Sequence, residues 1–371
     1  MPYIWEQQGW PGFTWRLEAL TAALTKAAHA QGRLLGAMEA LGFDLQSEAQ
    51  LRALTDDVLK SSEIEGENLP IDQVRSSVAR RLGLDLAGLA PADREVEGVV
   101  EMMTDATLNY AEPLTEARLF AWHAALFPTG WSGMRKITVG AWRKGPVEVV
   151  SGPVGREKVH YEGPPANRLG KEMDAFLQWF ANPKSPDPLL TAGLAHFWFV
   201  TLHPFDDGNG RIARALADMA LARAEHSSKR FYSLSAQIRV ERNEYYRLLE
   251  QSQKKSLDIT AWLQWFLACL HRAIEGAGDR SDSVLQKGRF WQRFAATQMN
   301  ARQIKVLNRL LDEPFEGKLT SSKWAKLAKC SQDTAGRDIT ALIKMGALQK
   351  DPGGGRSTSY SLVTSSPSGS R

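Results

Sequence analysis

The chain has 371 residues, of which 43% are hydrophobic and 24% are charged, and its formal net charge is +4. This balance is typical of a soluble protein of two or three domains, and no apolar run reaches the roughly 18 residues of a membrane-spanning helix. The N-terminus lacks the segments of a secretory signal, and two distant cysteines, Cys269 and Cys330, argue against a disulfide framework or a cysteine zinc site. We therefore expect a cytoplasmic protein without a membrane partner.

The positive charge is concentrated near the C-terminal end. The stretch from Arg302 to Arg356 carries eleven basic and six acidic residues, an excess that is larger than the net charge of the whole chain. This distribution indicates a basic C-terminal module.

Residues 1–90 carry helical patterns and are expected to form a small N-terminal helical domain. Leucines recur at helical spacing after Trp15, which predicts a first helix. A second helix is predicted over about 47–66, with Ser47 as its N-cap and Gly66 at its end. We expect three tryptophans to pack this domain: Trp5, Trp10 and Trp15.

The middle region, 91–275, is expected to be mostly helical with one interruption. Residues 135–165 mix β-branched residues with Gly-Pro breaks, which predicts one or two hairpins. A buried helix then begins with Asp187 as its N-cap and Pro188 at its first position. This helix is predicted to end near His203, because a proline follows.

The segment that leaves this helix reads HPFDDGNGRIAR, at residues 203–214. It is too polar for a core and too rich in different reactive groups for an ordinary connection. Gly208 and Gly210 let the backbone approach a ligand, and N–H groups beside a helix N-terminus form an anion site. Arg211, the predicted start of the next helix, and Arg214 are three residues apart, so both can hold the same phosphates.

Two further groups of this segment supply chemistry. Asp207 offers the hard oxygen ligand that Mg²⁺ takes when it is shared with substrate phosphates. His203 is suited to deprotonate an attacking hydroxyl, because the ordinary pKa of histidine is near neutrality. The combination indicates phosphoryl or nucleotidyl transfer. Each part alone has a plainer interpretation, as a helix cap, a turn or an ion-pair partner of Arg211. We expect His196 to lie in the core rather than to bind a metal with His203.

HPFDDGNGRIAR matches in full the signature of the Fic family, and the chain resembles that family. The resemblance implies a mainly α-helical protein with a β-hairpin flap that transfers AMP from ATP to a Ser, Thr or Tyr hydroxyl of a target protein. It implies that His203 is the base and that Asp207 holds Mg²⁺. The phosphates of ATP would be bound by the rest of the motif: Gly208, Asn209, Gly210, Arg211 and Arg214.

Two other segments resemble family elements less specifically. Tyr245 and Tyr246 lie where relatives contact the adenosine of ATP, and Gln253 stands where several relatives have an asparagine. Packing within a helix is the alternative interpretation of the tyrosines. The flap that clamps an extended target segment in the family corresponds to Val149, Val150, Ser151 and Gly152.

The sequence SSEIEG, at residues 61–66, matches the inhibitory helix motif of the family, with Ser61, Glu65 and Gly66 at its defining positions. The resemblance implies that the carboxylate of Glu65 pairs with Arg214 and takes the space of the γ-phosphate. Without the resemblance, Glu65 is interpreted as a solvated helix end.

The C-terminal region, 290–365, is predicted to hold three helices and a hairpin with a glycine-rich tip, and resembles a winged helix. In that class the helix over about 331–344 enters the major groove of DNA and the hairpin contacts the backbone. Docking of a protein partner, or self-association to a homodimer, is the alternative, and residues 366–371 are expected to be disordered. The candidate DNA contacts are Gln332, Asp333, Thr334, Arg337 and Arg356.

Two classes of function follow from these observations. The first is a protein adenylyltransferase that uses ATP and Mg²⁺ and is inhibited by its own Glu65. The second is a DNA-binding regulator whose Fic core senses a nucleotide or modifies itself. Removal of AMP from a protein is a third possibility for the same site, since the glutamate can position a water molecule.

Overall fold

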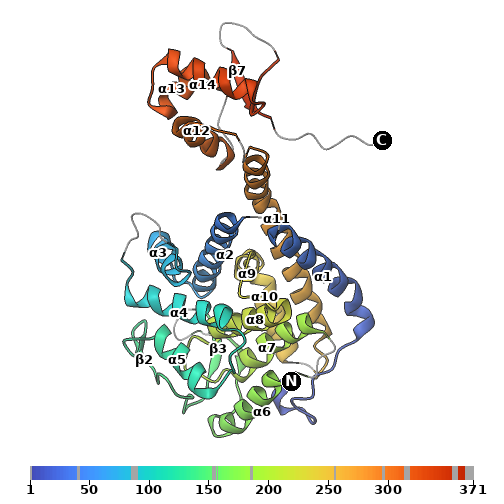
Figure 1. Cartoon of the computed structure of the whole chain (residues 1–371). Helices are drawn as coiled ribbons and strands as arrows, with labels where there is room; N and C mark the ends of the chain where they lie inside the picture. Colours follow the sequence, from blue (N-terminus) through green and yellow to red (C-terminus); the bar gives the residue numbers. More distant parts are fainter. Residues whose placement is uncertain are drawn as a thin grey trace. The chain divides into compact units, whose positions relative to one another are not determined.

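The computed structural model of the protein describes residues 2–39, 42–84, 91–152, 156, 158–183, 187–254, 256–294, 297–312, 318–352 and 358–363. These residues are mainly α-helical, as expected, with a few short strands (Figure 1). The chain divides into two compact units, one of residues 1–38 and 46–277 and the other of residues 39–45 and 278–371. Within the described ranges, no helix is long and apolar enough to cross a membrane.

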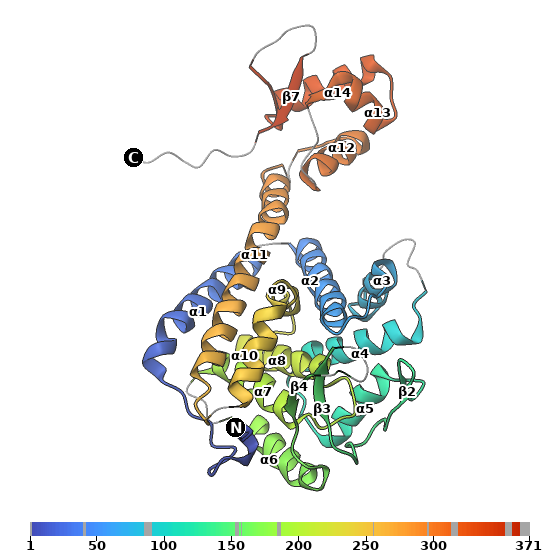
Figure 2. The same cartoon turned by 180° about the vertical axis from the view of Figure 1, so that it is seen from behind.

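The first unit is built from helices that gather around a central pair, α7 and α8 (Figure 2). Short 3-10 helices lie at Ile4–Glu6 and Ala166–Arg168. In chain order the α-helices are α1 (Leu17–Glu39), α2 (Phe43–Ile64), α3 (Ile71–Arg81), α4 (Arg94–Leu108), α5 (Glu116–Leu126), α6 (Leu169–Ala181), α7 (Pro188–Leu202), α8 (Asn209–Glu225), α9 (Leu234–Val240), α10 (Arg242–Gln253) and the first part of α11 (Thr260–Arg293).

Helix α7 forms the centre of this unit, because every residue from Leu189 to Leu202 is buried. Its predicted start is confirmed, since the Asp187 carboxylate accepts a hydrogen bond from Leu189 N at 2.8 Å and Pro188 is the first helical residue. The helix ends where His203 adopts a left-handed conformation (φ 48°, ψ 55°). The HPFDDGNGRIAR segment therefore connects the two most deeply buried helices.

The N-terminal tryptophans pack against the central helices and the hairpin. Trp5 Nε1 donates to Glu162 O at 2.9 Å, and Trp10 Nε1 donates to Glu172 Oε2 at 2.8 Å. The Trp10 ring also meets the Trp198 ring edge-on, with centroids 6.4 Å apart. The expectation that these rings pack a separate N-terminal domain was wrong for Trp5 and Trp10, because their partners lie on β4, α6 and α7.

Helix α2 begins earlier than predicted. It starts at Phe43, so Ser47 lies inside the helix and is not its N-cap. No helix breaker stands between Phe43 and Ser47, which lets the helix extend toward the N-terminus. At the other end α2 stops at Ile64, where Arg242 Nε donates to the free carbonyl at 2.9 Å and Gly66 takes a φ of 88°. The C-terminal end of α2 is thus fastened to α10.

Two antiparallel hairpins interrupt the helices; the second lies within the predicted region, 135–165, and the first begins before it. The first pairs β1 (Trp131–Ser132) with β2 (Arg135–Lys136), and the second pairs β3 (Glu148–Ser151) with β4 (Lys158–Glu162). In the second hairpin the pair Val149–Tyr161 is followed by Val150–Val159, so β4 carries one extra residue, His160. This residue forms a β-bulge, a feature that redirects a side chain.

The second unit contains the three helices and the hairpin that were predicted for the C-terminal region. A buried core that includes Trp324, Ile339 and Leu342 holds them together. A further strand, β5, was not predicted, and it pairs with β7 to give a sheet of order β5-β7-β6. Arg356 and residues 366–371 lie outside the described residues. The elements are α12 (Ala301–Asp312), β5 (Leu319–Thr320), α13 (Ser321–Ala328), α14 (Gln332–Lys344), β6 (Leu348–Lys350) and β7 (Ser359–Leu362).

Candidate functional site

His203 stands directly after α7 with one ring nitrogen already engaged. Its Nδ1 lies 3.2 Å from Val200 O. A carbonyl oxygen can only accept, so Nδ1 carries the proton and Nε2 is the nitrogen able to take one up. Burial lowers the pKa of His203 below its ordinary value of 6.5, and the nearby Arg143 charge acts in the same direction. His203 is therefore neutral at neutral pH, the form that a general base requires.

Arg143 holds the backbone around His203, and sequence reasoning missed it. Its side chain is 2% exposed, and its Nε donates to His203 O at 2.8 Å. The other guanidinium nitrogens donate to Gly145 O at 2.7 Å and to Pro164 O at 2.5 Å. Since all three contacts are to backbone carbonyls, Arg143 fixes the loop that presents the histidine. The sequence offered only its position within the predicted hairpin region, 135–165, which does not reveal burial.

Asn209 and Gly210 of the motif belong to the first turn of α8 rather than to a turn before it. The helix begins at Asn209, two positions before the predicted start, and Gly208 precedes it with a φ of 79°. Asn209 closes the loop, because its Oδ1 accepts from Phe205 N at 3.0 Å and its Nδ2 donates to Phe205 O at 2.9 Å. The first backbone N–H groups of α8, which have no carbonyl partner within the helix, therefore follow directly after this loop.

Asp207 lies in this loop with both carboxylate oxygens in hydrogen bonds. Oδ1 accepts from Gly208 N at 2.6 Å, and Oδ2 accepts from the Ser132 hydroxyl. Each oxygen keeps a second lone pair, so the carboxylate still fits Mg²⁺ of the kind that is shared with phosphates and water. Among the described residues there is no group of three or more His, Cys, Asp or Glu that would hold a metal without other ligands.

Arg214 is buried in the first turns of α8 and is bound by two of the three predicted inhibitory residues, Ser61 and Glu65. Its Nε donates to Ser61 Oγ at 2.8 Å, and its Nη2 donates to Ser61 O at 2.9 Å and to Glu65 Oε1 at 2.8 Å. Ser61 and Glu65 reach one guanidinium because they are four residues apart at the end of α2. Arg214 is 1% exposed, and its Nη1 has no hydrogen-bond partner among the described residues.

The Glu65 carboxylate lies against the start of α8. A Cβ added to Gly210 would come within 2.2 Å of Glu65 Oε1 and 3.2 Å of Arg214 Nη1. Glycine at this position therefore leaves space that the carboxylate occupies. A negative group at a helix N-terminus beside a buried arginine is in a favourable anion position. Gly66, the third residue of the SSEIEG match, follows the end of α2 with a positive φ. Its backbone N–H donates to Glu63 O, within the same segment.

Arg211 is bound by a second carboxylate, from Glu67, which sequence reasoning missed. Arg211 Nη1 lies 2.5 Å from Glu67 Oε2, and the guanidinium also lies over the Phe127 ring at 5.1 Å. Burial raises the pKa of Glu67, and the Arg211 charge opposes that rise. Both arginines of the motif are thus paired with carboxylates from the segment at the end of α2.

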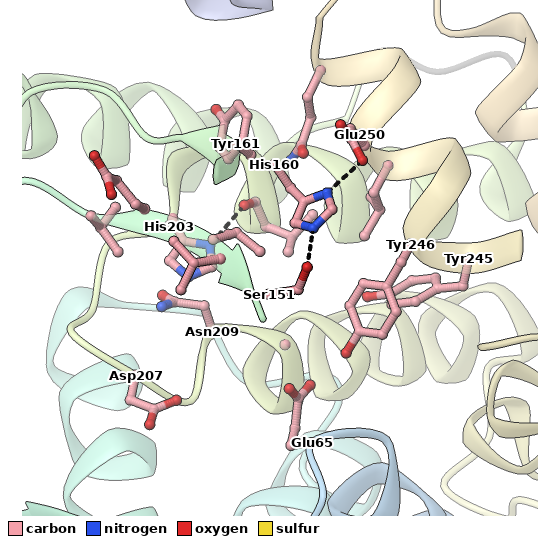
Figure 3. A pocket seen from close by; sticks show the side chains of 18 of the residues that line it. Glu65, Ser151, His160, Tyr161, His203, Asp207, Asn209, Tyr245, Tyr246 and Glu250 are labelled. Carbon is pink, nitrogen blue, oxygen red and sulfur yellow. Dashed lines mark hydrogen bonds and ion pairs between the residues drawn. The ribbon is translucent and has the colours of Figure 1, made fainter. Parts of the chain in front are cut away.

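Part of this group lines one cavity of about 1180 Å³ (Figure 3), whereas Arg211, Arg214 and Glu67 are not among its lining residues. The motif contributes His203, Asp207, Asn209 and Gly210, and Glu65 enters from the side of α2. Residues of the β3–β4 hairpin and of α10 form the remaining wall, including Val149, Val150, Ser151, Tyr245 and Tyr246. Gly152 follows β3 with a φ of 108°.

The two tyrosines differ in their surroundings. Tyr245 is 1% exposed, its hydroxyl lies 2.9 Å from His196 Nε2, and its ring packs near Trp262 and Trp265. His196 lies in the core, as predicted, and burial lowers its pKa to about 3. Tyr246 is the more accessible tyrosine, with its hydroxyl 3.5 Å from Ile64 O. Gln253 is buried, and its Nε2 donates to Thr201 Oγ1 at 3.2 Å.

Two family models match the chain. Residues 3–84 match a domain of unknown function (DUF4172), and residues 113–221 match the Fic/DOC family. The second match runs from the start of α5 to α8 and contains the loop with His203 and Asp207.

Similar curated proteins are named protein adenylyltransferase Fic. The protein of Nematostella vectensis is 35% identical over 115 residues, which are 30% of this chain and 25% of the relative. The protein of Drosophila melanogaster is 30% identical over 131 residues, which are 32% of this chain and 26% of the relative. The chain thus spans about a quarter of the length of the curated relatives it matches.

Solved structures with a similar fold include Fic proteins. A Fic family protein from Desulfovibrio desulfuricans has a TM-score of 0.57 and 20% identity, covering 94% of this chain and 97% of that chain. A Fic domain containing signaling protein from Bacteroides thetaiotaomicron has a TM-score of 0.52 and 16% identity, covering 71% and 97%. At these identities the likeness concerns the fold alone. With the match at residues 113–221 and the full motif in the loop before α8, the chain carries a Fic/DOC family domain over these residues.

Proposed function

We propose that this protein is an adenylyltransferase, which moves AMP from ATP to a hydroxyl side chain of a target protein and is restrained by Glu65. The observation that supports this function best is one cavity lined by a neutral histidine, His203, and by Glu65, whose carboxylate binds the buried Arg214. His203 offers Nε2 as a base, and Arg214 keeps Nη1 without a partner among the described residues. A buried guanidinium nitrogen in that state fits an incoming phosphate oxygen.

The residues of this chain divide the work of the reaction. His203 Nε2 takes the proton of the attacking hydroxyl while that oxygen bonds to the α-phosphorus and the bond to the leaving pyrophosphate breaks. The N–H groups at the start of α8, with Gly208 and Gly210, bind phosphate oxygens, and Arg211 and Arg214 add positive charge. Tyr245, Tyr246 and Asn209 complete the proposed nucleotide site: Asn209 by shaping the loop and the tyrosines by lining the wall.

Asp207 is the proposed holder of Mg²⁺. The ion would neutralise charge that develops on the phosphates, which is the chemistry that a divalent cation supplies in such reactions. The Asp207 carboxylate is held in place by Gly208 N and Ser132 Oγ, so its orientation is set by the protein itself.

Glu65 is the proposed restraint on the site. Its carboxylate occupies the space beside Gly210 and binds Arg214, where a phosphate of ATP is proposed to lie. The edge of β3, from Val149 to Gly152, is proposed to align an extended target segment by strand addition. Residues 1–90 would then carry the inhibitory segment and residues 91–275 the catalytic core.

This function is tested with His203→Ala in a Glu65→Gly background. The rate of AMP transfer from ATP to proteins of a cell lysate should fall by roughly 10²–10⁴-fold, because a general base is lost. The affinity for ATP should stay within about twofold, since the imidazole binds no phosphate in this account. An equal loss of ATP affinity would show that His203 is structural.

For the second unit we propose a winged-helix module that binds DNA. Support comes from α14, which buries Ala335, Ile339 and Leu342 and exposes Gln332 and Arg337. A helix with an apolar side in the core and a polar N-terminal half in solvent is suited to enter a DNA groove.

A further inference from the structure

The β3–β4 hairpin carries a hydrogen-bonded chain of side chains that the proposed function leaves unexplained (Figure 3). Ser151 Oγ lies 2.6 Å from His160 Nε2, and His160 Nδ1 lies 2.7 Å from Glu250 Oε2. An ionised carboxylate can only accept, so Nδ1 carries a proton, and in the neutral imidazole Nε2 accepts from the Ser151 hydroxyl. In this arrangement an imidazole can draw the proton from a hydroxyl while a carboxylate orients the ring.

The local structure holds this chain in place. His160 is the extra residue of the bulge in β4, and bulges redirect side chains near functional sites. Glu250 is fixed from α10 by Lys254 Nζ, which donates to Glu250 Oε1 at 2.7 Å. The hydrogen bond from Lys254, together with that from His160, holds the pKa of Glu250 below its ordinary value. The carboxylate is therefore ionised at neutral pH and available to the imidazole.

All three residues line the cavity that contains His203 and Asp207. In Figure 3, Ser151, His160 and Glu250 surround the same opening as His203 and Tyr246. The Ser151 side chain is exposed, so its hydroxyl is open to a group bound in the cavity. Two imidazoles, of His160 and His203, thus line one cavity.

A purely structural role does not account for the serine. The His160–Glu250 contact already fastens the hairpin to α10, and the backbone of Ser151 already pairs with Lys158. An exposed hydroxyl needs no protein partner, because water satisfies it. The contact between Ser151 and His160 therefore adds little to the attachment of the hairpin, and its chemical consequence is a more nucleophilic oxygen.

We propose that Ser151 is an acceptor of AMP in cis, and that His160 is its base. The proposal rests on the proposed function, which supplies ATP bound in the cavity. The Ser151 oxygen bonds to the α-phosphorus, the bond from that phosphorus to the leaving pyrophosphate breaks, and the hydroxyl proton passes to His160 Nε2. The products are a Ser151 adenylyl ester and pyrophosphate, and the modified hairpin edge is blocked for target segments.

The test uses the full chain with Glu65→Gly, Mg²⁺, ATP labelled at the α-phosphate and a cell lysate. Labelled peptides are located by mass spectrometry, and the ratio of label on Ser151 to label on lysate proteins is measured. Ser151→Thr should keep the label at this position and Ser151→Ala should remove it. His160→Gln, which keeps polar contacts but takes up no proton, should lower the ratio by at least about 10²-fold. His203→Ala should raise the ratio, because only the base for target hydroxyls is lost.

The outcomes separate this proposal from the proposed function. Label on lysate proteins with none on Ser151 overturns the proposal and leaves the adenylyltransferase standing. Label on no protein at all overturns both. Label on Ser151 that survives His160→Gln and disappears with His203→Ala also overturns it, because His203 would then serve both acceptors. Thermal melting of each variant shows that the fold is retained.

Discussion

Each arginine of α8 that belongs to the motif meets a carboxylate from the segment at the end of α2. Arg214 pairs with Glu65 at 2.8 Å and Arg211 pairs with Glu67 at 2.5 Å. The two guanidinium groups are nearly fully buried, whereas the carboxylates are 30% and 46% exposed. A buried positive charge requires a partner, so a bound triphosphate can replace the carboxylates but solvent cannot.

Glu67→Gln should raise AMP transfer, because it removes the charge that holds Arg211. The gain should be smaller than that of Glu65→Gly, since Glu67 is half exposed and does not lie against Gly210. Initial rates at several ATP concentrations would show the change mainly as a lower KM for ATP. Glu63→Gln is the matched control, because Glu63 pairs with Lys60 and Arg239 instead. Equal gains from Glu63→Gln and Glu67→Gln would contradict a specific contact.

The pH profile of transfer should reflect the lowered pKa of His203. The base acts only when unprotonated, so the rate falls as the pH drops through its pKa. Burial places the pKa of His203 below 6.5. The negative charge of Glu65 raises this pKa, so its removal in the Glu65→Gly variant lowers the pKa further. We expect a constant rate from about pH 8 to about pH 6.5 and a decline only below that. A decline that begins above pH 7 would mean that another group controls the reaction.

At the scale of elements, α2 is fastened to the domain at two places. Its end is held by Arg242, and its middle is held by Asp57, whose Oδ1 accepts from Ser233 Oγ at 2.6 Å and Ser235 N at 3.1 Å. Ser233 is also the N-cap of α9. The position of Glu65 therefore depends on a buried polar contact between α2 and the start of α9.

Asp57→Ala should destabilise the protein by about 2–3 kcal/mol, because it leaves the buried donors of Ser233 and Ser235 without their acceptor. The full chain is unfolded in urea, and the free energy of unfolding is taken from the transition of the first unit. Asp174→Asn, on the exposed side of α6, is the control and should stay within about 0.5 kcal/mol of the parent. A loss no larger than that of the control would show that α2 is held by apolar packing alone.

Elements with local signals could be predicted from the sequence. The start of α7 follows from Asp187 and Pro188, and the start of α14 follows from Ser331, whose hydroxyl accepts from Thr334 N at 3.2 Å. The starts of α2 and α8 were misplaced, because a competing polar residue, Ser47 or Arg211, stood near the true boundary.

Contacts between distant segments were predictable only where the resemblance supplied them. Glu65 and Arg214 were expected to meet because of the SSEIEG match, and they do. Glu67 and Arg211 are 144 residues apart, and His160 and Glu250 are 90 apart, so spacing alone gave no indication of either contact. The bulge that redirects His160 depends on the register of β3 and β4, which composition does not encode.

At the scale of the whole molecule, the chain combines a Fic domain unit with a second compact unit that has its own apolar core. If the second unit binds DNA, the full chain should bind a DNA duplex with an affinity that falls steeply with added salt. Arg337→Gln should weaken binding and reduce the salt slope by about one. Lys60→Gln, in the first unit, is the control. Absent or salt-insensitive binding would favour docking of a protein or a second copy.

The central claim is that Glu65 restrains a nucleotidyl transfer site, and labelling from ATP labelled at the α-phosphate tests it most directly. Glu65→Gly frees Arg214 and the space beside Gly210, so it should incorporate at least about tenfold more label than the parent, as expected for loss of a charge-assisted contact. Glu65→Asp should fall between the two, because the shorter side chain keeps the charge. Label on Glu65→Gly no greater than on the parent would contradict the account.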